Sequence, residues 1–305
     1  MKHIAVTLLA IFISCAAVAQ TSRAAAIAAR MHDPRSEYVI VACHRGDWRN
    51  YPENSIPAIE SVIRMGADIV EIDLKMTRDS VLVLSHDRTL NRCTTGKGEI
   101  SSHTWDEIRD LRLKRAHNVA TDTVHIPTLR QALSVCKDRI CVNVDQGYEY
   151  YDQVLAIAEE LGMTDQILIK GGKSIAEVEA REAAHEHNMM YMPIVDIEKK
   201  KGMDLFKSYI ESGKMPIAFE VCWSSDDLLF SQVAGQIVAR GAKLWVNTIW
   251  GSLCGGSGKD DDAAFAAKDP HEVYGRYLDA GVSMIQTDRP QLLIPYLESR
   301  GRHTL

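Results

Sequence analysis

Segments with strand-like and helix-like patterns alternate along almost the whole chain, and this alternation restricts the possible folds more than any other feature. Eight runs of apolar, often β-branched residues are each followed by a segment with helical periodicity. Strands that alternate with helices form parallel sheets covered by those helices. Eight such units in about 250 residues predict a closed (β/α)8 barrel, or TIM barrel. The expected strands cover residues 38–43, 68–74, 140–144, 167–169, 190–195, 217–221, 244–248 and 283–287.

An open, doubly wound sheet is the alternative architecture for this pattern. Open sheets that bind nucleotides carry a glycine-rich turn after the first strand. Here the first strand ends at Cys43 and continues as His44-Arg45-Gly46, without such a turn. The closed barrel is therefore the prediction.

Two segments interrupt the alternation. Residues 81–84 extend the second strand after a turn, and residues 87–128 then form a small insertion with a helix near residues 104–111. Residues 251–269 are rich in Gly, Ser and Asp, which predicts a loop. Within it, Asp260-Asp261-Asp262 is expected to be exposed to solvent.

The first twenty residues are typical of a secretory signal peptide. A short basic start precedes the apolar run Ile4–Cys15, which is too short to span a membrane comfortably, and Ala17-Val18-Ala19 matches a cleavage pattern. We predict a signal peptide over residues 1–19, cleavage after Ala19, and a secreted or periplasmic location. A retained anchor and a lipoprotein attached at Cys15 are the alternatives, but the residues before Cys15 fit a lipobox poorly.

After the signal peptide, we expect a short helical leader over residues 21–36 and one barrel domain over residues 37–305. The chain of 305 residues is 46% apolar and 25% charged, as in ordinary soluble proteins. Its net charge of −6 gives no sign of binding nucleic acid through phosphates, and no later segment is apolar enough to span a membrane. An acidic protein that handles phosphate needs a local basic pocket or a metal ion.

Two carboxylates share one face of the second predicted strand. Side chains alternate across a strand, so Ile69, Glu71 and Asp73 point to the same side. Adjacent carboxylates inside a barrel are unfavourable unless a positive charge lies between them. Asp145 ends the neighbouring third strand and could reach the same charge. Because oxygen ligands suit Mg²⁺ or Ca²⁺, we predict that these three carboxylates hold one divalent cation; a solvated pair, and a helix N-cap for Asp145, are the alternatives.

Two histidines also follow strands. His44 ends the first strand and His86 follows residues 81–84, so both are expected at the carboxyl-terminal mouth of the barrel. Histidine changes charge near neutral pH and can act as a general acid or base. Arg45 can bind two phosphate oxygens through its planar guanidinium. Structural histidines and a surface arginine are the ordinary alternatives, but the grouping of these residues around the carboxylates favours catalysis.

Later strand ends supply candidate substrate contacts. Lys170 ends the fourth strand and offers a second phosphate contact. Glu220, Asn247 and Trp250 lie at or just after the ends of the sixth and seventh strands and are predicted to line the pocket. For Trp250, ordinary packing is the alternative.

Two further residues lie between the first strand and the helix that follows it. Asn54 has the side chain of a helix N-cap, whereas Glu53 is expected to position His44 or the cation. We assign both as supporting residues of the site.

The ordered set of short motifs resembles the glycerophosphodiester phosphodiesterases, which are similar to the broader phosphatidylinositol-phospholipase-C-like barrels. No single motif is specific, but their order over residues 42–290 is. The matching segments are His44-Arg45-Gly46, Pro52-Glu53-Asn54-Ser55, Gly66-Ala67-Asp68, Glu71-Ile72-Asp73, His86-Asp87-Arg88-Thr89-Leu90-Asn91-Arg92, Thr95-Gly96-Lys97-Gly98, Ile126-Pro127-Thr128-Leu129 and Thr287-Asp288-Arg289-Pro290.

The resemblance implies a role for each matching position. His44 and His86 would form the acid/base pair, and Arg45 would bind the phosphate. One Mg²⁺ or Ca²⁺ would be held by Glu71, Asp73 and Asp145. The family pattern has a glutamate followed two residues later by a lysine at the third strand, where this chain reads Asp145-Gln146-Gly147; Lys170 is expected to supply the missing charge.

These assignments predict a metal-dependent enzyme that cleaves small glycerophosphodiesters to glycerol 3-phosphate and an alcohol. One histidine would take the proton of the glycerol 2-hydroxyl, the other would protonate the leaving alcohol, and water would then open the cyclic phosphate. The alternatives are a phospholipase-D-like enzyme acting on intact lipids and a non-catalytic protein that binds phosphorylated head groups. The first would need an apolar rim, and the second would be expected to lose a histidine or a carboxylate of the set.

Overall fold

The computed structural model of the chain describes residues 21–250 and 260–305. The predicted signal peptide lies in residues 1–20, outside the described residues. In the part of the chain that the structure describes, no helix combines the length and apolar character needed to cross a membrane.

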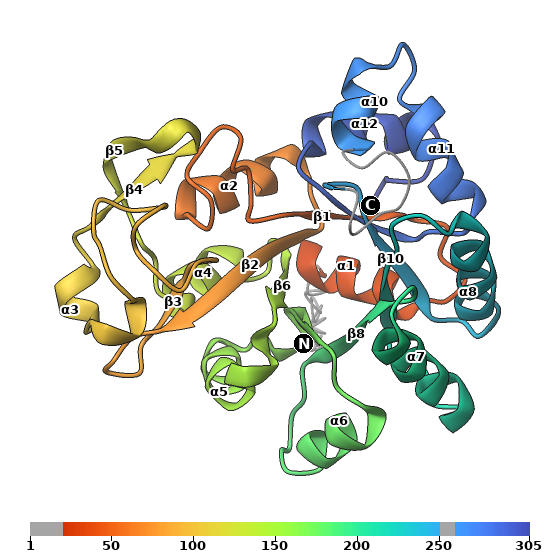
Figure 1. Cartoon of the computed structure of the whole chain (residues 1–305), viewed down its shortest axis with the longest axis horizontal. Helices are drawn as coiled ribbons and strands as arrows, with labels where there is room; N and C mark the ends of the chain where they lie inside the picture. Colours follow the sequence, from red (N-terminus) through yellow and green to blue (C-terminus); the bar gives the residue numbers. More distant parts are fainter. Residues whose placement is uncertain (1–20, 251–259) are drawn as a thin grey trace, which may run out of the picture.

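Eight parallel strands form a closed barrel (Figure 1). They follow one another around the ring in chain order, and β1 pairs with both β2 and β11. The predicted (β/α)8 barrel is confirmed, and the open sheet is wrong because β1 has a partner on each side. The strands are β1 (Ile40–Cys43), β2 (Ile69–Met76), β6 (Cys141–Asp145), β7 (Ile167–Gly171), β8 (Met190–Asp196), β9 (Ala218–Cys222), β10 (Lys243–Asn247) and β11 (Met284–Thr287).

Helices surround the barrel, and local sequence signals set their ends (Figure 1). The Ser55 hydroxyl accepts a hydrogen bond from the Ala58 N–H and caps the helix that Gly66 ends in a left-handed conformation. The surrounding helices are α2 (Ile56–Met65), α4 (Leu129–Cys136), α5 (Tyr151–Leu161), α6 (Ile175–Glu182), α7 (Lys200–Ser212), α8 (Asp227–Ala239), α10 (Asp260–Ala266), α11 (His271–Asp279) and α12 (Pro290–Ser299). Short 3-10 turns precede α5 and β7, namely η3 (Gly147–Tyr150) and η4 (Thr164–Gln166).

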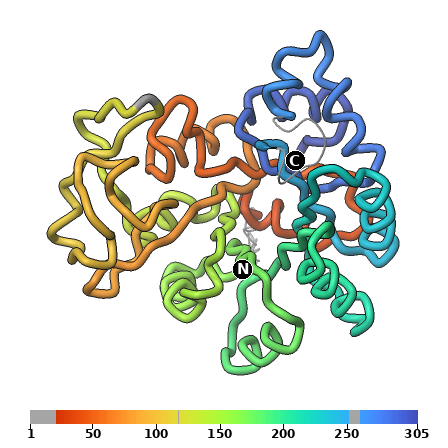
Figure 2. The backbone as a smooth tube through the Cα atoms, in the orientation of Figure 1, coloured from red at the N-terminus to blue at the C-terminus, as the bar shows by residue number. Residues whose placement is uncertain are grey.

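The insertion projects from one side of the barrel (Figure 2). It is preceded by β3 (Leu82–Leu84), which pairs antiparallel with the outer end of β2 and is therefore a separate strand. A short helix lies where one was expected, but the hairpin that follows was not predicted. Its mostly polar and charged residues show no apolar alternation. The remaining elements are η1 (Ile100–Ser102), α3 (Trp105–Ile108), β4 (Arg112–Arg115), η2 (Ala116–Asn118) and β5 (Val119–His125).

The side chains inside the barrel form two layers with different chemistry. At the amino-terminal end they are apolar, and α1 (Arg23–His32) packs against them through Ala24, Ile27, Ala28 and Met31. The predicted leader helix is thus a plug for this end of the barrel. Further along the strands the inward-facing residues become polar: Ile69 is followed by Glu71 on β2, and Leu168 by Lys170 on β7. The opposite mouth therefore carries the functional groups.

Candidate active site

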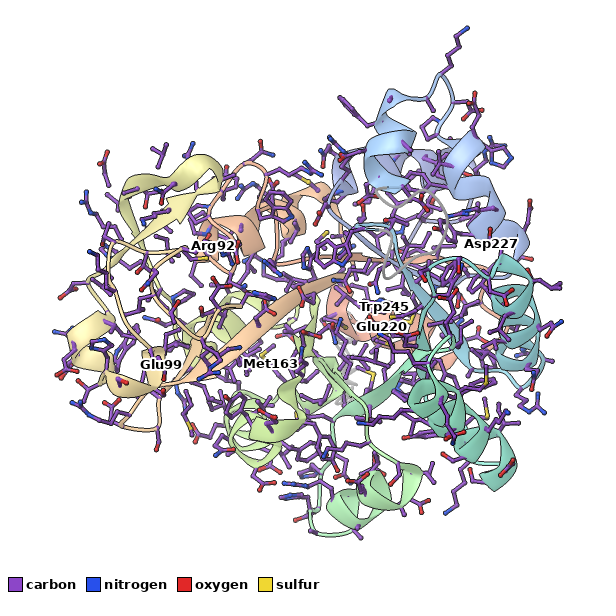
Figure 3. All side chains as sticks on the ribbon, in the orientation of Figure 1. Arg92, Glu99, Met163, Glu220, Asp227 and Trp245 are labelled. Carbon is purple, nitrogen blue, oxygen red and sulfur yellow. The ribbon has the colours of Figure 1, made fainter. Side chains whose placement is uncertain are left out.

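A cavity of about 300 Å³ lies in the polar layer at the carboxyl ends of the strands. Glu220 lies close to Trp245 at the centre of the barrel, whereas Arg92 and Glu99 lie out in the insertion (Figure 3). Of the residues predicted from the sequence, all except Glu53 and Asn54 line this cavity. They are His44, Arg45, Glu71, Asp73, His86, Asp145, Lys170, Glu220, Asn247 and Trp250.

Three carboxylates meet on one wall of the cavity. One oxygen each from Glu71, Asp73 and Asp145 lies within 4.8 Å of the others. The parallel register of β2 and β6 causes this, because it sets Asp73 beside Asp145. Glu71 is only 2% exposed and Asp73 only 5%. Burial, together with the negative charge of Asp73, raises the pKa of Glu71 well above its usual value.

Asn54 holds one of these carboxylates in place. Its side-chain N–H group donates to Asp73 Oδ2 at 2.8 Å, and its side-chain oxygen accepts the Asp73 backbone N–H at 3.0 Å. The interpretation of Asn54 as the N-cap of the next helix is wrong, because Ser55 caps that helix. Asn54 itself has a positive φ of 55°, a conformation that asparagine tolerates better than most residues. The clamp orients Asp73 toward the other two carboxylates.

Arg45 joins the carboxylate wall to the loop before α2. Its backbone N–H donates to Glu71 Oε2 at 2.7 Å, and its guanidinium lies 3.1 Å from Glu53 and 3.4 Å from Asp73. Glu53 also pairs with Arg92 at 2.6 Å. Burial alone would raise the pKa of Glu53, but Arg92 and Arg45 together hold it below its usual value. Glu53 thus positions Arg45, rather than His44 or a cation as the sequence had suggested.

Lys170 lines the same cavity from β7, next to the strand that carries Asp145. Its ammonium is 3.3 Å from Asp145 and 3.1 Å from Glu220. Burial would lower the pKa of Lys170, but the charges of Glu220, Asp145 and Glu71 raise it above the ordinary value, so the side chain stays cationic. A positive charge therefore does lie beside Asp145, although it comes from the next strand. Asn247 donates to Glu220 Oε1 at 2.8 Å and fixes the other carboxylate.

His44 has a buried carboxylate partner. Its Nδ1 lies 2.9 Å from Asp288 Oδ1, which also accepts the indole N–H of Trp48 at 2.6 Å. A carboxylate can only accept, so the His44 Nδ1–H donates and Nε2 remains to accept a proton. Trp250 packs edge-on against the His44 ring, with the ring centroids 5.3 Å apart. This tautomer is the one required of a general base.

His86 has the same kind of partner in a more open position. Its Nδ1 lies 2.9 Å from Asp87 Oδ1, and its side chain is 46% exposed. Arg92 donates to both oxygens of Asp87 at 2.8 Å, and these hydrogen bonds hold the pKa of Asp87 far below its usual value. His86 is therefore oriented by a permanently ionised carboxylate.

Asp261 anchors the loop that carries Asp288. It is 1% exposed and accepts hydrogen bonds from the hydroxyl groups of Thr248, Tyr274 and Thr287 and from the Asp288 backbone N–H. The prediction of a loop over residues 251–269 is wrong for residues 260–266, which form α10, and residues 251–259 lie outside the described residues. The expected exposure of Asp260-Asp261-Asp262 is wrong for two of the three aspartates. Asp260, at 2% exposure, pairs with Arg276 at 2.6 Å, and only Asp262 remains exposed.

Asp261 predicts a measurable pH dependence of stability. Burial raises its pKa from 3.8 to about 6. A raised pKa in the folded state adds stability below about pH 4, and this contribution is lost as pH rises through 6. We compare the free energy of unfolding of Asp261→Asn with that of the wild type. From pH 4 to pH 7, this difference should change in favour of the variant by on the order of 2–3 kcal/mol. Urea unfolding at both pH values measures this shift. An exposed control, Asp279→Asn, should show none, and a pH-independent Asp261→Asn difference would contradict the assignment.

The sequence-based assignment omitted three residues that the structure brings to the site. Asp288 and Asp87 each orient a histidine, and Gln286 accepts a hydrogen bond from Lys170 at 3.3 Å. A signal was present for two of them, since Gln286 and Asp288 continue the inward-facing alternation that begins at Met284. Asp87 stands directly after His86 in one of the matching motifs.

Comparison with known proteins identifies the family. A model of the glycerophosphoryl diester phosphodiesterase family matches residues 44–204, more than half of the 305-residue chain. A model described as a domain of unknown function matches residues 191–297. The glycerophosphodiester phosphodiesterase of Caldanaerobacter subterraneus subsp. tengcongensis is 26% identical over 275 residues, which cover 86% of this chain and 99% of that protein. Human glycerophosphodiester phosphodiesterase 1 is 38% identical over 105 residues, which cover 34% of this chain and 31% of that protein.

Solved structures share the barrel. A glycerophosphoryl diester phosphodiesterase from Parabacteroides distasonis superposes with a TM-score of 0.70 at 22% identity, covering 92% of this chain and 93% of that one. An Oleispira antarctica phosphodiesterase in complex with the product sn-glycerol-3-phosphate has a TM-score of 0.59 at 18% identity, covering 85% and 96%. These likenesses show the fold, and the family model shows the family. The chain belongs to the glycerophosphoryl diester phosphodiesterase family of enzymes.

Proposed function

We propose that this enzyme hydrolyses small glycerophosphodiesters to glycerol 3-phosphate and an alcohol, with one divalent cation and two histidines. The observation that carries the proposal is the pairing of His44 with Asp288 and of His86 with Asp87 on either side of a three-carboxylate cluster. Two oriented imidazoles and a cation site are the groups that phosphodiester cleavage by an internal hydroxyl requires. The glycerol 3-phosphate bound to the Oleispira antarctica relative agrees with this substrate class.

The charges around the cavity fit a divalent cation. Four carboxylates line it, from Glu71, Asp73, Asp145 and Glu220, and two side chains that are always cationic, Arg45 and Lys170, face them. Two negative charges are left to balance, which suits Mg²⁺ or Ca²⁺ bound by oxygen ligands. Glu71, Asp73 and Asp145 would hold the cation. When bound, it would stabilise charge on the phosphate oxygens and acidify the glycerol 2-hydroxyl.

His44 acts as the general base in this proposal. It is buried in the lining of the reaction cavity, and Asp288 fixes the tautomer in which Nε2 accepts a proton. Arg45, held by Glu53 beside Asp73, binds a phosphate oxygen and keeps the glycerol hydroxyl near His44. Proton removal by His44 Nε2 allows the 2-hydroxyl to attack phosphorus.

His86 acts as the general acid. It lines the reaction cavity on its open side, where the departing alcohol can leave to solvent. Its Nε2–H protonates the alcohol oxygen as the phosphorus–oxygen bond breaks. In the second half-reaction the roles reverse, because His86 takes a proton from water and His44 returns one to the 2-hydroxyl as the cyclic phosphate opens.

Removal of the cation tests the cofactor. Treatment with EDTA followed by gel filtration should lower glycerol 3-phosphate release from a panel of glycerophosphodiesters by roughly a hundredfold or more, because the charge stabilisation of the phosphate is lost. Added Mg²⁺ or Ca²⁺ should restore it, whereas Na⁺ at the same ionic strength should not. Full activity after chelation would contradict metal dependence.

The signal-peptide pattern of residues 1–19 supports the further proposal that the enzyme works outside the cytoplasm as a single barrel over residues 37–305, with the insertion at about residues 87–128. Sequencing the amino terminus of the exported protein tests cleavage after Ala19. A start at Met1 would contradict it.

A further inference from the structure

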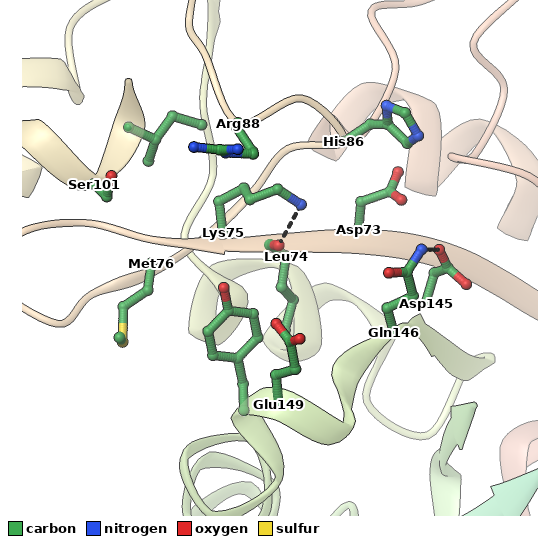
Figure 4. A pocket seen from close by; sticks show the side chains of 12 residues that line it. Asp73, Leu74, Lys75, Met76, His86, Arg88, Ser101, Asp145, Gln146 and Glu149 are labelled. Atoms are coloured by element: carbon green, nitrogen blue, oxygen red, sulfur yellow. Dashed lines mark hydrogen bonds between the residues drawn. The ribbon is translucent and has the colours of Figure 1, made fainter. Parts of the chain in front are cut away.

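A second cavity, of about 530 Å³, opens beside the reaction cavity. The two share a boundary formed by Asp73, His86, Asp145 and Gln146. The second cavity extends away from the barrel axis, between the outer half of β2, the start of the insertion, and η3 (Figure 4). Its volume lies within the range of about 300–1,000 Å³ that is usual for small-molecule sites.

The geometry points to this second cavity as the site of the leaving alcohol, and we propose that it selects a neutral alcohol with several hydroxyl groups. The assignment rests on the proposed function. His44 lies only in the reaction cavity, whereas His86 lines both. An alcohol that receives its proton from His86 therefore departs on the side of the second cavity.

The length of β2 brings a cation to this cavity. β2 pairs with β6 only as far as Asp73 and Asp145, and its outer residues run on to pair with β3. Lys75 continues the inward-facing row of Glu71 and Asp73 beyond the barrel. Among the described residues, its ammonium donates to the Leu74 carbonyl at 2.9 Å and pairs with no carboxylate. Two of its three hydrogens remain available to hydroxyl oxygens.

The other walls supply both donors and an acceptor. Arg88 lies on the same side of β2 as Lys75 and His86, and Gln146 and Glu149 lie on the other side (Figure 4). Glu149 is exposed, and its carboxylate makes no ion pair within the described part of the chain. The hydroxyl groups of Tyr150 and Ser101 complete the lining. A hydroxyl group both donates and accepts, so several hydroxyls on one ligand can satisfy such a mixed wall.

The same lining disfavours a cationic alcohol. A trimethylammonium group forms no ordinary hydrogen bonds and binds best among several aromatic faces. This cavity offers one aromatic side chain, Tyr150. Arg88 pairs with Glu99 at 3.1 Å, whereas Lys75 lies on the same side of β2 as His86 (Figure 4), with its charge unpaired among the described residues. Repulsion from Lys75 acts near the point where the alcohol oxygen leaves, so choline and ethanolamine esters should be the poorer substrates.

The test compares alcohols that share the glycerol phosphate half. Hydrolysis of glycerophosphoinositol, glycerophosphocholine and glycerophosphoethanolamine is followed by release of glycerol 3-phosphate in a coupled dehydrogenase assay. The wild-type kcat/KM should favour the inositol ester over both amino-alcohol esters by roughly tenfold or more, the effect of one hydrogen bond to a charged group. In Lys75→Met, which removes both the donor and the repelling charge, the ratio of inositol to choline kcat/KM should fall by roughly tenfold.

A control substitution and an inhibition measurement on the wild-type protein separate a specific effect on the alcohol site from general damage to the enzyme. Lys207→Met changes an exposed lysine on α7, and the substrate ratio should not move in this variant. In the wild-type protein, free myo-inositol should inhibit competitively at concentrations where choline does not. Equal kcat/KM values for all three esters, or equal losses on all esters in Lys75→Met, would overturn the assignment. Failure to release glycerol 3-phosphate from any ester would instead overturn the proposed function, and the alcohol site with it.

Discussion

Replacing His44 with alanine is expected to lower kcat for glycerol 3-phosphate release by roughly 10²–10⁴-fold for every leaving alcohol, the usual contribution of a general base. The physical reason is that no other group in the described part of the reaction cavity combines a proton-accepting nitrogen with a fixed tautomer at this depth. Asp288 holds the Nδ1–H of His44, and Trp250 packs against its ring. Attack by the 2-hydroxyl therefore depends on this one imidazole.

The loss in His86→Ala should depend on the leaving group, and this dependence separates the two roles. For an ordinary alcohol, the loss should again be roughly 10²–10⁴-fold. A nitrophenolate needs no proton to leave, so the nitrophenyl ester of glycerol phosphate should lose far less. Steady-state rates on both esters measure the contrast, with His187→Ala, an exposed histidine, as the control. Similar losses on both esters in His86→Ala, or a leaving-group dependence in His44→Ala, would show that the roles are assigned the wrong way round.

The second large effect concerns the cation. Glu71→Gln should weaken binding of Mg²⁺ or Ca²⁺, measured by calorimetry, by roughly a hundredfold or more, since losing a direct ligand costs at least as much as losing a supporting contact. The metal-free variant should nevertheless be at least as stable as the metal-free wild type. The new amide would keep an oxygen for the Arg45 N–H, and the substitution would remove a buried charge that lies beside Asp73.

Weaker cation binding without a loss of stability distinguishes a metal ligand from a residue that only supports the fold. Damage to the fold would lower cation affinity and the free energy of unfolding together. Glu211→Gln, on the outer surface of α7, should change neither quantity. Unchanged cation affinity in Glu71→Gln would contradict the assignment of this wall as the metal site.

Most of what could be predicted from the sequence came from the alternation of inward-facing and outward-facing side chains along the strands. Because every second residue of a strand points inward, the pattern alone placed the Glu71 and Asp73 pair and the strand-end residues His44 and Lys170 at one mouth of the barrel. The same rule located Asp145 beside Asp73, as the register of β2 and β6 shows. These are consequences of local periodicity combined with a closed ring.

Contacts between loops could not be predicted in this way. Asp288 contacts His44, and Asp261 in turn accepts the Asp288 backbone N–H, although the two aspartates follow different strands. Nothing in the spacing of the sequence fixes how such segments approach one another. The acidic run at residues 260–262 has the composition of a solvated loop, yet hydrogen-bond donors from β11, α11 and the end of β10 surround Asp261. The composition of a segment indicates how well it tolerates water, but it does not identify the hydrogen-bond partners that the rest of the fold provides.

The plug formed by α1 has a consequence for how the barrel is built during folding. Its apolar face packs against inward-facing residues of strands from β1 to β11, so its partners are spread over nearly the whole sequence. The Arg23 guanidinium also donates hydrogen bonds to the carbonyls of Gly66 and Ala67, between α2 and β2. Contacts of such long sequence separation form late and slow the search for the native state. We therefore expect α1 to pack onto the barrel only after strands from both ends of the sequence have come together.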